Sequence, residues 1–335
     1  MKIGAILPHL LLFGGVRRYI ETGNVFVSRG HRFTLFTPDG VSADWTIFKG
    51  EVKPLSSLNE HDLDVLITGS PEFTGYLDAS GAKLKIFYIQ IEGVAREREI
   101  TTSGKYNIMV NSKGLAERIR RKYSIPVIDG TGGVDPAIFY PLGDPREEMD
   151  DRLPGSCPVG VICYGRRSRP RKGTRFVIDA VRRLRRKGFD IRLHLFDHRT
   201  TEEEDSRVGF DPGLPFVYYL DLSQERMAAM YGSSNIFVSA ERRAGWSNTS
   251  AEAAACALPI VCTKSGTSDF AVDGSSALVV PWRNHRPISR AIERLILDPG
   301  MAVRLGIEAR RRIMDFTWER VCDRMESGFV RLLEE

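Results

Sequence analysis

A loop in the second half of the chain places two kinds of cation between glycines. Arg166 and Lys172 stand in this loop, bounded by Gly165 and Gly173, directly after a short apolar run. The planar guanidinium of arginine bonds two oxygens at once, and lysine supplies a compact charge. The pair is therefore suited to gripping a diphosphate from two sides. A solvated basic loop is the alternative interpretation.

A polar segment further along the chain leads into a helix rich in small residues. The segment consists of Gly245, Trp246, Ser247, Asn248 and Thr249. Ser, Asn and Thr are good residues to begin a helix, and the free N–H groups of its first turn attract phosphate. Glu252 follows one turn into the helix. A carboxylate is an unusual core residue among alanines, so we expect it to accept hydrogen bonds from ribose or sugar hydroxyls.

A third loop, near the N-terminus, carries the adjacent glycines Gly14 and Gly15 just ahead of a predicted helix. Adjacent glycines let the backbone approach a ligand, and a helix N-terminus favours an anion. A simple tight turn explains the same residues equally well. The dinucleotide fingerprint GxGxxG is absent, which disfavours an NAD enzyme.

Length and composition bound the elements that position these loops. At 335 residues the chain exceeds what one hydrophobic core usually organises, which favours two domains. No apolar run approaches the roughly 18 to 20 residues of a membrane-spanning helix, and Pro8 soon interrupts the opening apolar run. We therefore expect a first strand rather than a signal peptide, and a cytoplasmic protein. The five cysteines match no disulfide framework or CxxC motif and are interpreted as small buried hydrophobic residues.

Short apolar runs alternate with amphipathic stretches, which predicts an α/β fold with mainly parallel, doubly wound sheets. The expected strands of the first half are Lys2–Leu7, Arg32–Thr37, Val65–Thr68, Leu84–Gln90 and Ile108–Asn111, with helices at Val16–Arg29 and Lys113–Tyr123. Those of the second half are Pro158–Tyr164, Ile191–Phe196, Phe216–Leu220, Asn235–Ser239, Pro259–Thr263 and Ala277–Val280, with helices at Thr174–Lys187, Gln224–Tyr231, Ser250–Ala257 and Ile288–Leu297. The segment Pro141–Pro158 is rich in Pro, Gly and acidic residues and is the predicted interdomain linker.

The order of these segments resembles glycosyltransferase family 4, whose members are retaining enzymes of the GT-B fold. The family signature is similar to Ala244–Ser247, then Glu252, then Ala257–Val261 in this sequence. Further landmarks are Gly132–Pro136, Asp269–Gly274 and Phe316–Glu319. The resemblance covers nearly the whole chain. It implies two Rossmann-like domains facing a cleft: an acceptor-binding domain at 1–145, a donor-binding domain at 146–312, and a crossover helix at 313–335 that returns to the first domain.

The resemblance also implies roles for the candidate residues. Gly15, Arg166 and Lys172 would contact the donor diphosphate, the backbone around Ser247–Thr249 would approach the donor phosphates, and Glu252 would bind the ribose. Gly14, Gly245 and Trp246 are also expected to belong to the donor site. Positive charge at the diphosphate stabilises the leaving nucleotide. Arg166, Lys172 and Glu252 are therefore the predicted catalytic residues, with no metal or other cofactor.

Two departures from the family pattern concern the sugar. The first glutamate of the signature is Ala244 here, so either Glu241 replaces it or the donor presents fewer hydroxyls, as a deoxysugar would. Many relatives carry a histidine near the reacting carbon, where this chain has Gln90 and Glu92. We expect these residues and His9 to be candidate contacts of the sugar or acceptor.

The predicted function is transfer of a glycosyl unit from a nucleoside-diphosphate sugar to a glycan, lipid-linked or small-molecule acceptor, with retention of configuration. The alternatives are a sugar-nucleotide epimerase of the same fold and a catalytically weak subunit that binds nucleotide sugars. The basic run Arg182–Lys187 lies on a predicted helix and favours a solvated face. With the apolar Leu10–Phe13 it also allows peripheral contact with the inner face of a membrane, whereas nucleic acid is not an expected partner because the basic runs lack interleaved aromatic residues.

Overall fold

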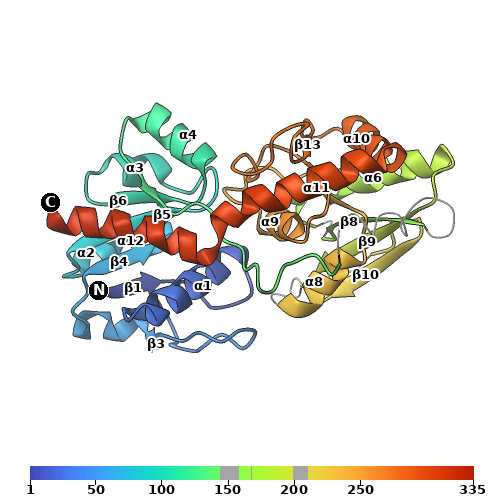
Figure 1. Ribbon diagram of the computed structural model, residues 1–335. Coiled ribbons are helices and arrows are strands. Elements are labelled where there is room, and N and C mark those ends of the chain that lie inside the picture. The colour runs from blue at the N-terminus through green and yellow to red at the C-terminus, as the bar shows by residue number, and fades with distance from the viewer. Residues whose placement is uncertain (144–157, 167, 199–209) are drawn as a thin grey trace. The chain divides into compact units, whose positions relative to one another are not determined.

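The computed structural model describes residues 1–143, 158–166, 168–198 and 210–335. They form two compact units (Figure 1). The first consists of Met1–Gly133 together with Phe316–Glu335, and the second of Val134–Asp315. The interdomain boundary predicted at residues 145/146, and most of the predicted linker, lie outside the described residues. The predicted domain limits therefore stay predictions.

The first unit is built on a parallel sheet of seven strands in the order β3-β2-β1-β4-β5-β6-β7. The strands are β1 (Lys2–Ile6), β2 (Arg32–Thr37), β3 (Glu51–Pro54), β4 (Val65–Thr68), β5 (Leu84–Ile89), β6 (Asn107–Val110) and β7 (Ile128–Asp129). The helices are α1 (Gly14–Ser28), α2 (Thr74–Ala79), α3 (Glu97–Thr102), α4 (Lys113–Tyr123) and α12 (Trp318–Glu334). The strand order reverses between β1 and β4, the point at which doubly wound sheets bind their ligands.

The last helix, α12, packs on the sheet of the first unit, beside α1 (Figure 1). Phe329 is fully buried and stacks on Phe26 of α1, with ring centroids 6.1 Å apart. Arg29 adds an ion pair of 2.9 Å to Glu326 of α12. The predicted return of the terminal helix to the first domain is confirmed.

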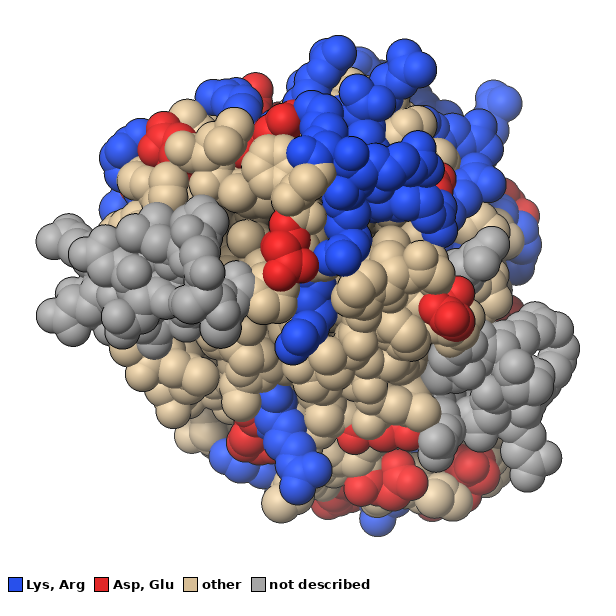
Figure 2. All heavy atoms as spheres, turned by 90° about the vertical axis from the view of Figure 1, so that its right-hand side faces the viewer, with Lys and Arg blue, Asp and Glu red and all other residues tan. Residues whose placement is uncertain are grey.

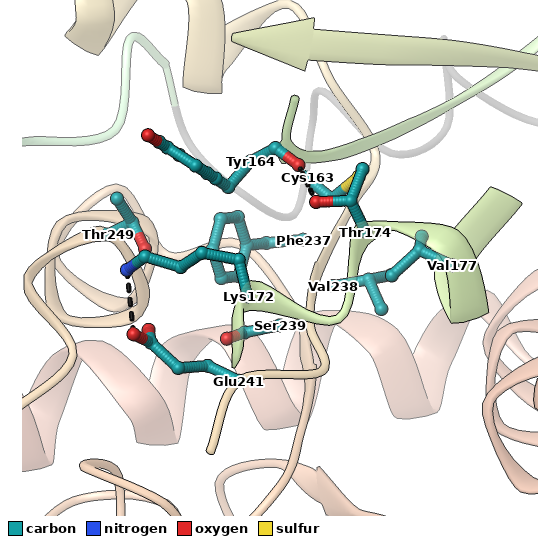
Figure 3. Close-up of a pocket in the computed structure, with 10 residues that line it drawn as sticks. All are labelled: Cys163, Tyr164, Lys172, Thr174, Val177, Phe237, Val238, Ser239, Glu241 and Thr249. Carbon is teal, nitrogen blue, oxygen red and sulfur yellow. Dashed lines mark hydrogen bonds and ion pairs between the residues drawn. The ribbon is translucent and has the colours of Figure 1, made fainter. Parts of the chain in front are cut away.

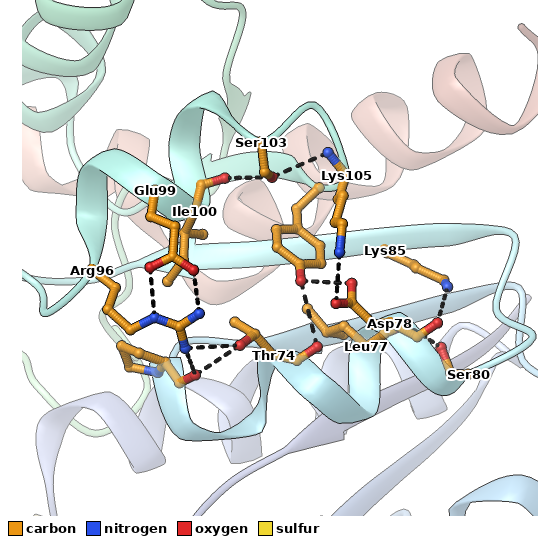
Figure 4. Close-up of polar contacts among 12 residues, drawn as sticks. Thr74, Leu77, Asp78, Ser80, Lys85, Arg96, Glu99, Ile100, Ser103 and Lys105 are labelled. Atoms are coloured by element: carbon orange, nitrogen blue, oxygen red, sulfur yellow. Dashed lines mark hydrogen bonds and ion pairs between the residues drawn. The ribbon is translucent and has the colours of Figure 1, made fainter.

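Polar contacts join the short helix α2 and the turn before it to α3 and to the residues just ahead of β6 (Figure 4). Arg96 pairs with Glu99 and donates to the carbonyl of Pro71 at 3.2 Å. Asp78 accepts hydrogen bonds from Tyr106 at 2.7 Å and from Lys105 at 3.0 Å. The Tyr106 hydroxyl loses hydration and faces this carboxylate, which raises its pKa to about 12. The contacts hold the chain that leads out of β4 and β5.

The second unit contains a parallel sheet of six strands in the order β10-β9-β8-β11-β12-β13. The strands are β8 (Val159–Tyr164), β9 (Ile191–Asp197), β10 (Phe216–Leu220), β11 (Ile236–Ser239), β12 (Ile260–Cys262) and β13 (Leu278–Val279). The helices are α6 (Thr174–Arg186), α8 (Gln224–Gly232), α9 (Asn248–Ala255), α10 (His285–Leu297) and α11 (Pro299–Ile313). Its core joins apolar residues of β8, β9 and β11 to the inner faces of α6 and α10.

The predicted α/β class with two parallel, doubly wound sheets is confirmed. The short elements β3, β7, α2 and α3 were missed, because stretches this short carry little periodicity. The described cysteines Cys163, Cys256, Cys262 and Cys322 are buried free thiols, as expected. Among the described residues, no helix is both long and apolar enough to cross a bilayer.

Candidate functional site

A small pocket lies at the carboxyl edge of the second sheet, where β8 and β11 end side by side (Figure 3). Lys172, Glu241 and Thr249 line it, from the loop after β8, the loop after β11 and the first turn of α9. Aromatic Tyr164 and Phe237 close its apolar side. Two segments that are far apart in the sequence, the loop after β8 and the connection from β11 into α9, therefore bring polar side chains to one point.

Lys172 meets a carboxylate in this pocket. Its ammonium lies 2.7 Å from Oε1 of Glu241, and the two side chains are only 19% and 5% exposed. The same ammonium lies 5.1 Å from the centre of the Tyr164 ring, close enough for a cation–π contact. This geometry is consistent with the prediction that Lys172 lies beside a ligand site. Contact between Lys172 and a ligand stays a prediction.

The loop after β8 reaches this position because Gly173 follows the lysine. Gly173 has φ +72°, and a side chain there would collide with the carbonyl of Ala240. The backbone N–H of Arg242 donates to the carbonyl of Arg171 at 2.9 Å, which joins the loops after β8 and β11 directly. Only glycine permits both the left-handed backbone and this close approach. The backbone conformation and the contact with Ala240 thus explain why a glycine follows Lys172.

Arg166, the other predicted phosphate-binding cation, is buried and 1% exposed. Its Nε donates to Oδ2 of Asp197 at 2.7 Å, and its guanidinium also donates to the carbonyl of His198. The side chain of Asp197 is fully buried too. No local pattern in the sequence indicates this partner, although Asp197 ends β9, the strand next to β8. Direct contact between Arg166 and a diphosphate stays a prediction, and the observed contacts join the residues that follow β8 and β9.

Helix α9 starts at Asn248, with Ser247 in the N-cap position. Ser247 is buried, its hydroxyl lies 2.8 Å from that of Ser250, and its N–H donates to the carbonyl of Gly266 at 2.8 Å. The prediction placed the helix start at Ser250, two residues late. Thr249 in the first turn lines the pocket beside Lys172, so the helix N-terminus and the ammonium serve one location.

Glu252 is 3% exposed and lies one turn into α9. Oε2 of its carboxylate accepts a hydrogen bond of 2.9 Å from the hydroxyl of Tyr231, the penultimate residue of α8. Tyr231 is fully buried among aromatic rings that include Phe237. The tyrosine therefore fixes the orientation of the carboxylate. Sequence reasoning missed Tyr231, since nothing local distinguishes it from an ordinary core residue.

The segment between β11 and α9 is packed rather than open. Ala244 is 7% exposed, and its N–H donates to the hydroxyl of Ser265 at 2.9 Å. Gly245 is buried, and Trp246 packs on Phe270 with ring centroids 5.2 Å apart. Glu241, the predicted substitute for the missing glutamate at Ala244, lies in the pocket with Lys172. Its contact with a sugar stays a prediction.

The candidate residues of the first unit lie at the carboxyl edge of its own sheet. A side chain at Gly15, in the first turn of α1 after Gly14, would come within 2.7 Å of Oε1 of Gln90, which follows β5. His9 follows β1, and its buried Nδ1 has no hydrogen-bond partner in the described part of the chain. Burial lowers the pKa of His9. Glu92 is exposed.

The acidic residues Asp62 and Asp64, just ahead of β4, have structural partners. Asp64 accepts the N–H of Lys2 at 2.8 Å and pairs with Lys83 at 2.9 Å, while Asp62 pairs with Lys2 at 2.9 Å. Both carboxylates therefore support the entry into β4. Over the ranges that the structure describes, no group of three or more His, Cys, Asp or Glu side chains is placed to hold a metal ion.

Residues 158–298, which include every candidate of the second unit, match the family model described as glycosyl transferases group 1. The match lies within the second unit and covers less than half of the chain. Among curated proteins, the chain is 29% identical over 198 residues to the GDP-mannose-dependent alpha-(1-6)-phosphatidylinositol monomannoside mannosyltransferase of Mycolicibacterium smegmatis, an alignment that covers 56% of this chain and 51% of that protein. It is 27% identical over 179 residues to the capsular polysaccharide biosynthesis glycosyltransferase CapM of Staphylococcus aureus, covering 52% of this chain and 47% of that protein.

The chain thus spans about half the length of these two curated glycosyltransferases. Solved structures share the fold over nearly the whole chain. Sucrose-phosphate synthase from Thermosynechococcus elongatus superposes with a TM-score of 0.76 at 17% identity, covering 99% of both chains. HepE from Anabaena, solved with UDP-glucose, gives a TM-score of 0.75 at 13% identity and covers 99% of this chain and 100% of that one. The predicted kinship with GT-B glycosyltransferases is confirmed.

Proposed function

We propose that the chain transfers a glycosyl unit from a nucleoside-diphosphate sugar to an acceptor, and that the second unit binds the donor. The observation that carries the proposal is the meeting of Lys172, Glu241 and the first turn of α9 at the carboxyl edge of β8 and β11. This edge is where doubly wound sheets bind nucleotides. It lies within the segment that matches group 1 glycosyltransferases.

The donor diphosphate would replace Glu241 as the partner of Lys172. A phosphate offers the ammonium oxygens similar to those of the carboxylate with which it competes. The N–H groups in the first turn of α9 supply further donors next to Thr249. Negative charge builds on the diphosphate as its bond to the sugar breaks, and Lys172 and these N–H groups would stabilise that charge. Arg166 would act through its ion pair with Asp197, which supports the loop, rather than by presenting its guanidinium to the diphosphate.

Glu252 would accept hydrogen bonds from the ribose hydroxyls of the nucleotide. Its carboxylate is buried and held by Tyr231, so it is preorganised and little side-chain freedom is lost on binding.

The sugar would meet Glu241 once Lys172 has turned to the diphosphate. Ala244 offers no polar group at the usual glutamate position, which favours a donor with fewer hydroxyls, such as a deoxysugar. One relative is named GDP-mannose-dependent, and HepE was solved with UDP-glucose. Assays with UDP-sugars and with GDP-sugars would identify the base and the sugar of the donor that this chain uses.

The acceptor would bind to the first unit, near His9, Gln90 and Glu92. Gln90 is able to orient a hydroxyl but not to take its proton, so the donor phosphate itself would accept the proton and the product would retain the anomeric configuration. The reaction would need no metal ion, because Lys172 and the start of α9 supply the positive charge. Turnover unchanged by a chelator, with the anomer of the product assigned by NMR, tests both statements.

The decisive experiment offers UDP- and GDP-sugars with glycan, lipid-linked and small-molecule acceptors, and analyses the products. Lys172→Ala and Glu252→Ala should each lower turnover at least ~10-fold, as loss of a transition-state contact does. Lys187→Ala and Glu293→Ala, which remove an exposed ion pair of the same residue types, should not. Full activity in the first two variants would refute the site. Conversion of the donor without any acceptor would identify an epimerase instead, and binding without any product a non-catalytic subunit.

A further inference from the structure

The outer faces of α6 and α10 carry a concentration of arginine. The two helices pack side by side on the sheet of the second unit (Figure 1). Their exposed arginines are Arg175, Arg183 and Arg186 on α6, and Arg286, Arg290 and Arg294 on α10. Figure 2 shows Lys and Arg side chains gathered over the upper part of this side of the second unit, whereas acidic side chains are more frequent along the lower edge. We name these six residues the arginine face.

The spacing on α10 places its arginines in one stripe. Arg286, Arg290 and Arg294 recur every four residues, close to the 3.6 residues of a helical turn. Leu297 falls on the same stripe, about three turns after Arg286, and is 69% exposed. The opposite side of α10 is buried and includes Ile288, Ile292 and Leu295. The solvent side of α10 therefore combines arginines with one fully presented apolar side chain.

The arginine face is not neutralised by neighbouring carboxylates. Glu293 of α10 forms an ion pair of 2.8 Å with Lys187, and Asp179 of α6 forms one of 2.8 Å with Arg182. Within the described ranges, none of the six arginines has a carboxylate oxygen within ion-pair distance. Like charges held this close repel one another, and a polyanion relieves the repulsion.

We propose that the arginine face docks on an anionic lipid bilayer. Guanidinium groups bond phosphate in pairs, and a row of phosphate headgroups matches two adjacent rows of arginine. Leu297 would enter the boundary between headgroups and acyl chains, while the arginine stems lie along it. The long axis of α10 from Arg286 to Leu297 spans roughly 16 Å, so several headgroups are contacted together. Neither helix presents an exposed aromatic ring on which nucleic-acid bases would stack.

Co-sedimentation of the full chain with vesicles tests this surface independently of glycosyl transfer. We expect binding to vesicles of equal parts phosphatidylcholine and phosphatidylglycerol, none to phosphatidylcholine alone, and weaker binding as salt is raised. The triple variant Arg286→Gln, Arg290→Gln, Arg294→Gln should lower the partition coefficient at least ~10-fold, since each cation near an anionic surface contributes. Leu297→Ser should weaken binding by a smaller factor that does not depend on salt.

The matched control removes the same charge from the first unit. Arg98, Arg120 and Arg121 are exposed on α3 and α4, and their replacement by Gln should change the partition coefficient less than ~2-fold if the surface rather than the net charge is responsible. Equal losses in the two triple variants would overturn the proposal. So would binding of duplex DNA or RNA by the wild-type chain without binding of anionic vesicles. Thermal unfolding confirms that each variant is folded before it is compared.

Discussion

Two groups of cations on the second unit differ in what surrounds them. Arg166 and Lys172, near the end of β8, are 1% and 19% exposed, and each has its own carboxylate, Asp197 or Glu241. The arginines of α6 and α10 are exposed and lack such partners in the described part of the chain. A ligand at the first group must compete with a carboxylate for one position. A partner that binds the exposed arginines of α6 and α10 meets guanidinium groups that are already hydrated.

The difference determines what each group does. A buried cation that has lost its partner is strongly destabilising, so the pairs at the loop constrain the fold and select a compact anion of matching shape. Exposed cations contribute little to the stability of the fold. Together they attract an anionic partner, over a distance that shortens as the salt concentration rises. The first arrangement suits a site for one ligand, and the second an extended surface.

The largest effect should follow from breaking the buried pair. Asp197→Asn leaves the guanidinium of Arg166 buried without a counter-charge, and we expect a loss of about 3–5 kcal/mol in the free energy of unfolding. Urea denaturation measures this loss. Glu293→Gln, which breaks the exposed pair with Lys187, should cost less than about 1 kcal/mol. Similar losses in the two variants would mean that the buried pair contributes no more to stability than the exposed one.

A smaller effect is expected at the pair in the pocket. Glu241→Gln frees Lys172 for a diphosphate and should raise the affinity for free UDP or GDP by about tenfold, or ~1.4 kcal/mol. In the Lys172→Ala background the same change should alter the affinity less than ~2-fold, because the coupled partner is gone. Calorimetry of all four proteins gives the coupling directly. No coupling would separate Glu241 from the anion site.

If Glu241 also contacts the sugar, the Glu241→Gln variant should bind the nucleotide sugar less well than the free nucleotide. The comparison uses the same four proteins and one further ligand. An equal gain for both ligands would make Glu241 a counter-ion alone.

The smallest effect should come from the arginine face. Replacing Arg175, Arg183 and Arg186 by Gln should change the free energy of unfolding by no more than about 0.5 kcal/mol per residue, since these side chains are exposed and without carboxylate partners among the described residues. Denaturation in urea measures this change as well. A loss of several kcal/mol would show that the face has a structural role instead.

The sequence predicted elements with strong periodicity well. Arg32–Thr37, Val65–Thr68, Phe216–Leu220 and Lys113–Tyr123 have their predicted bounds. The crossover helix expected at 313–335 is α12, which begins at Trp318 after α11 has ended at Ile313. The two-residue strand β7 was missed because it depends on pairing with β6 rather than on a pattern of its own.

The residues of the site could be predicted by type, but their partners could not. Lys172, Thr249 and Glu252 were recognised from glycines, helix-capping residues and an isolated carboxylate. The pairing of Arg166 with Asp197 and the bond from Tyr231 to Glu252 connect residues that the sheet brings together from distant parts of the sequence. Local patterns hold no information about such long-range pairs, so the burial of Arg166 was not foreseen.

The most direct test of the donor site is saturation-transfer NMR with a panel of UDP- and GDP-sugars. We predict transfer from the protein to the base and ribose protons of at least one member, and its loss in folded Lys172→Ala and Glu252→Ala variants. Absence of transfer for every nucleotide sugar, or unchanged transfer in both variants, would contradict a donor site at the ends of β8 and β11.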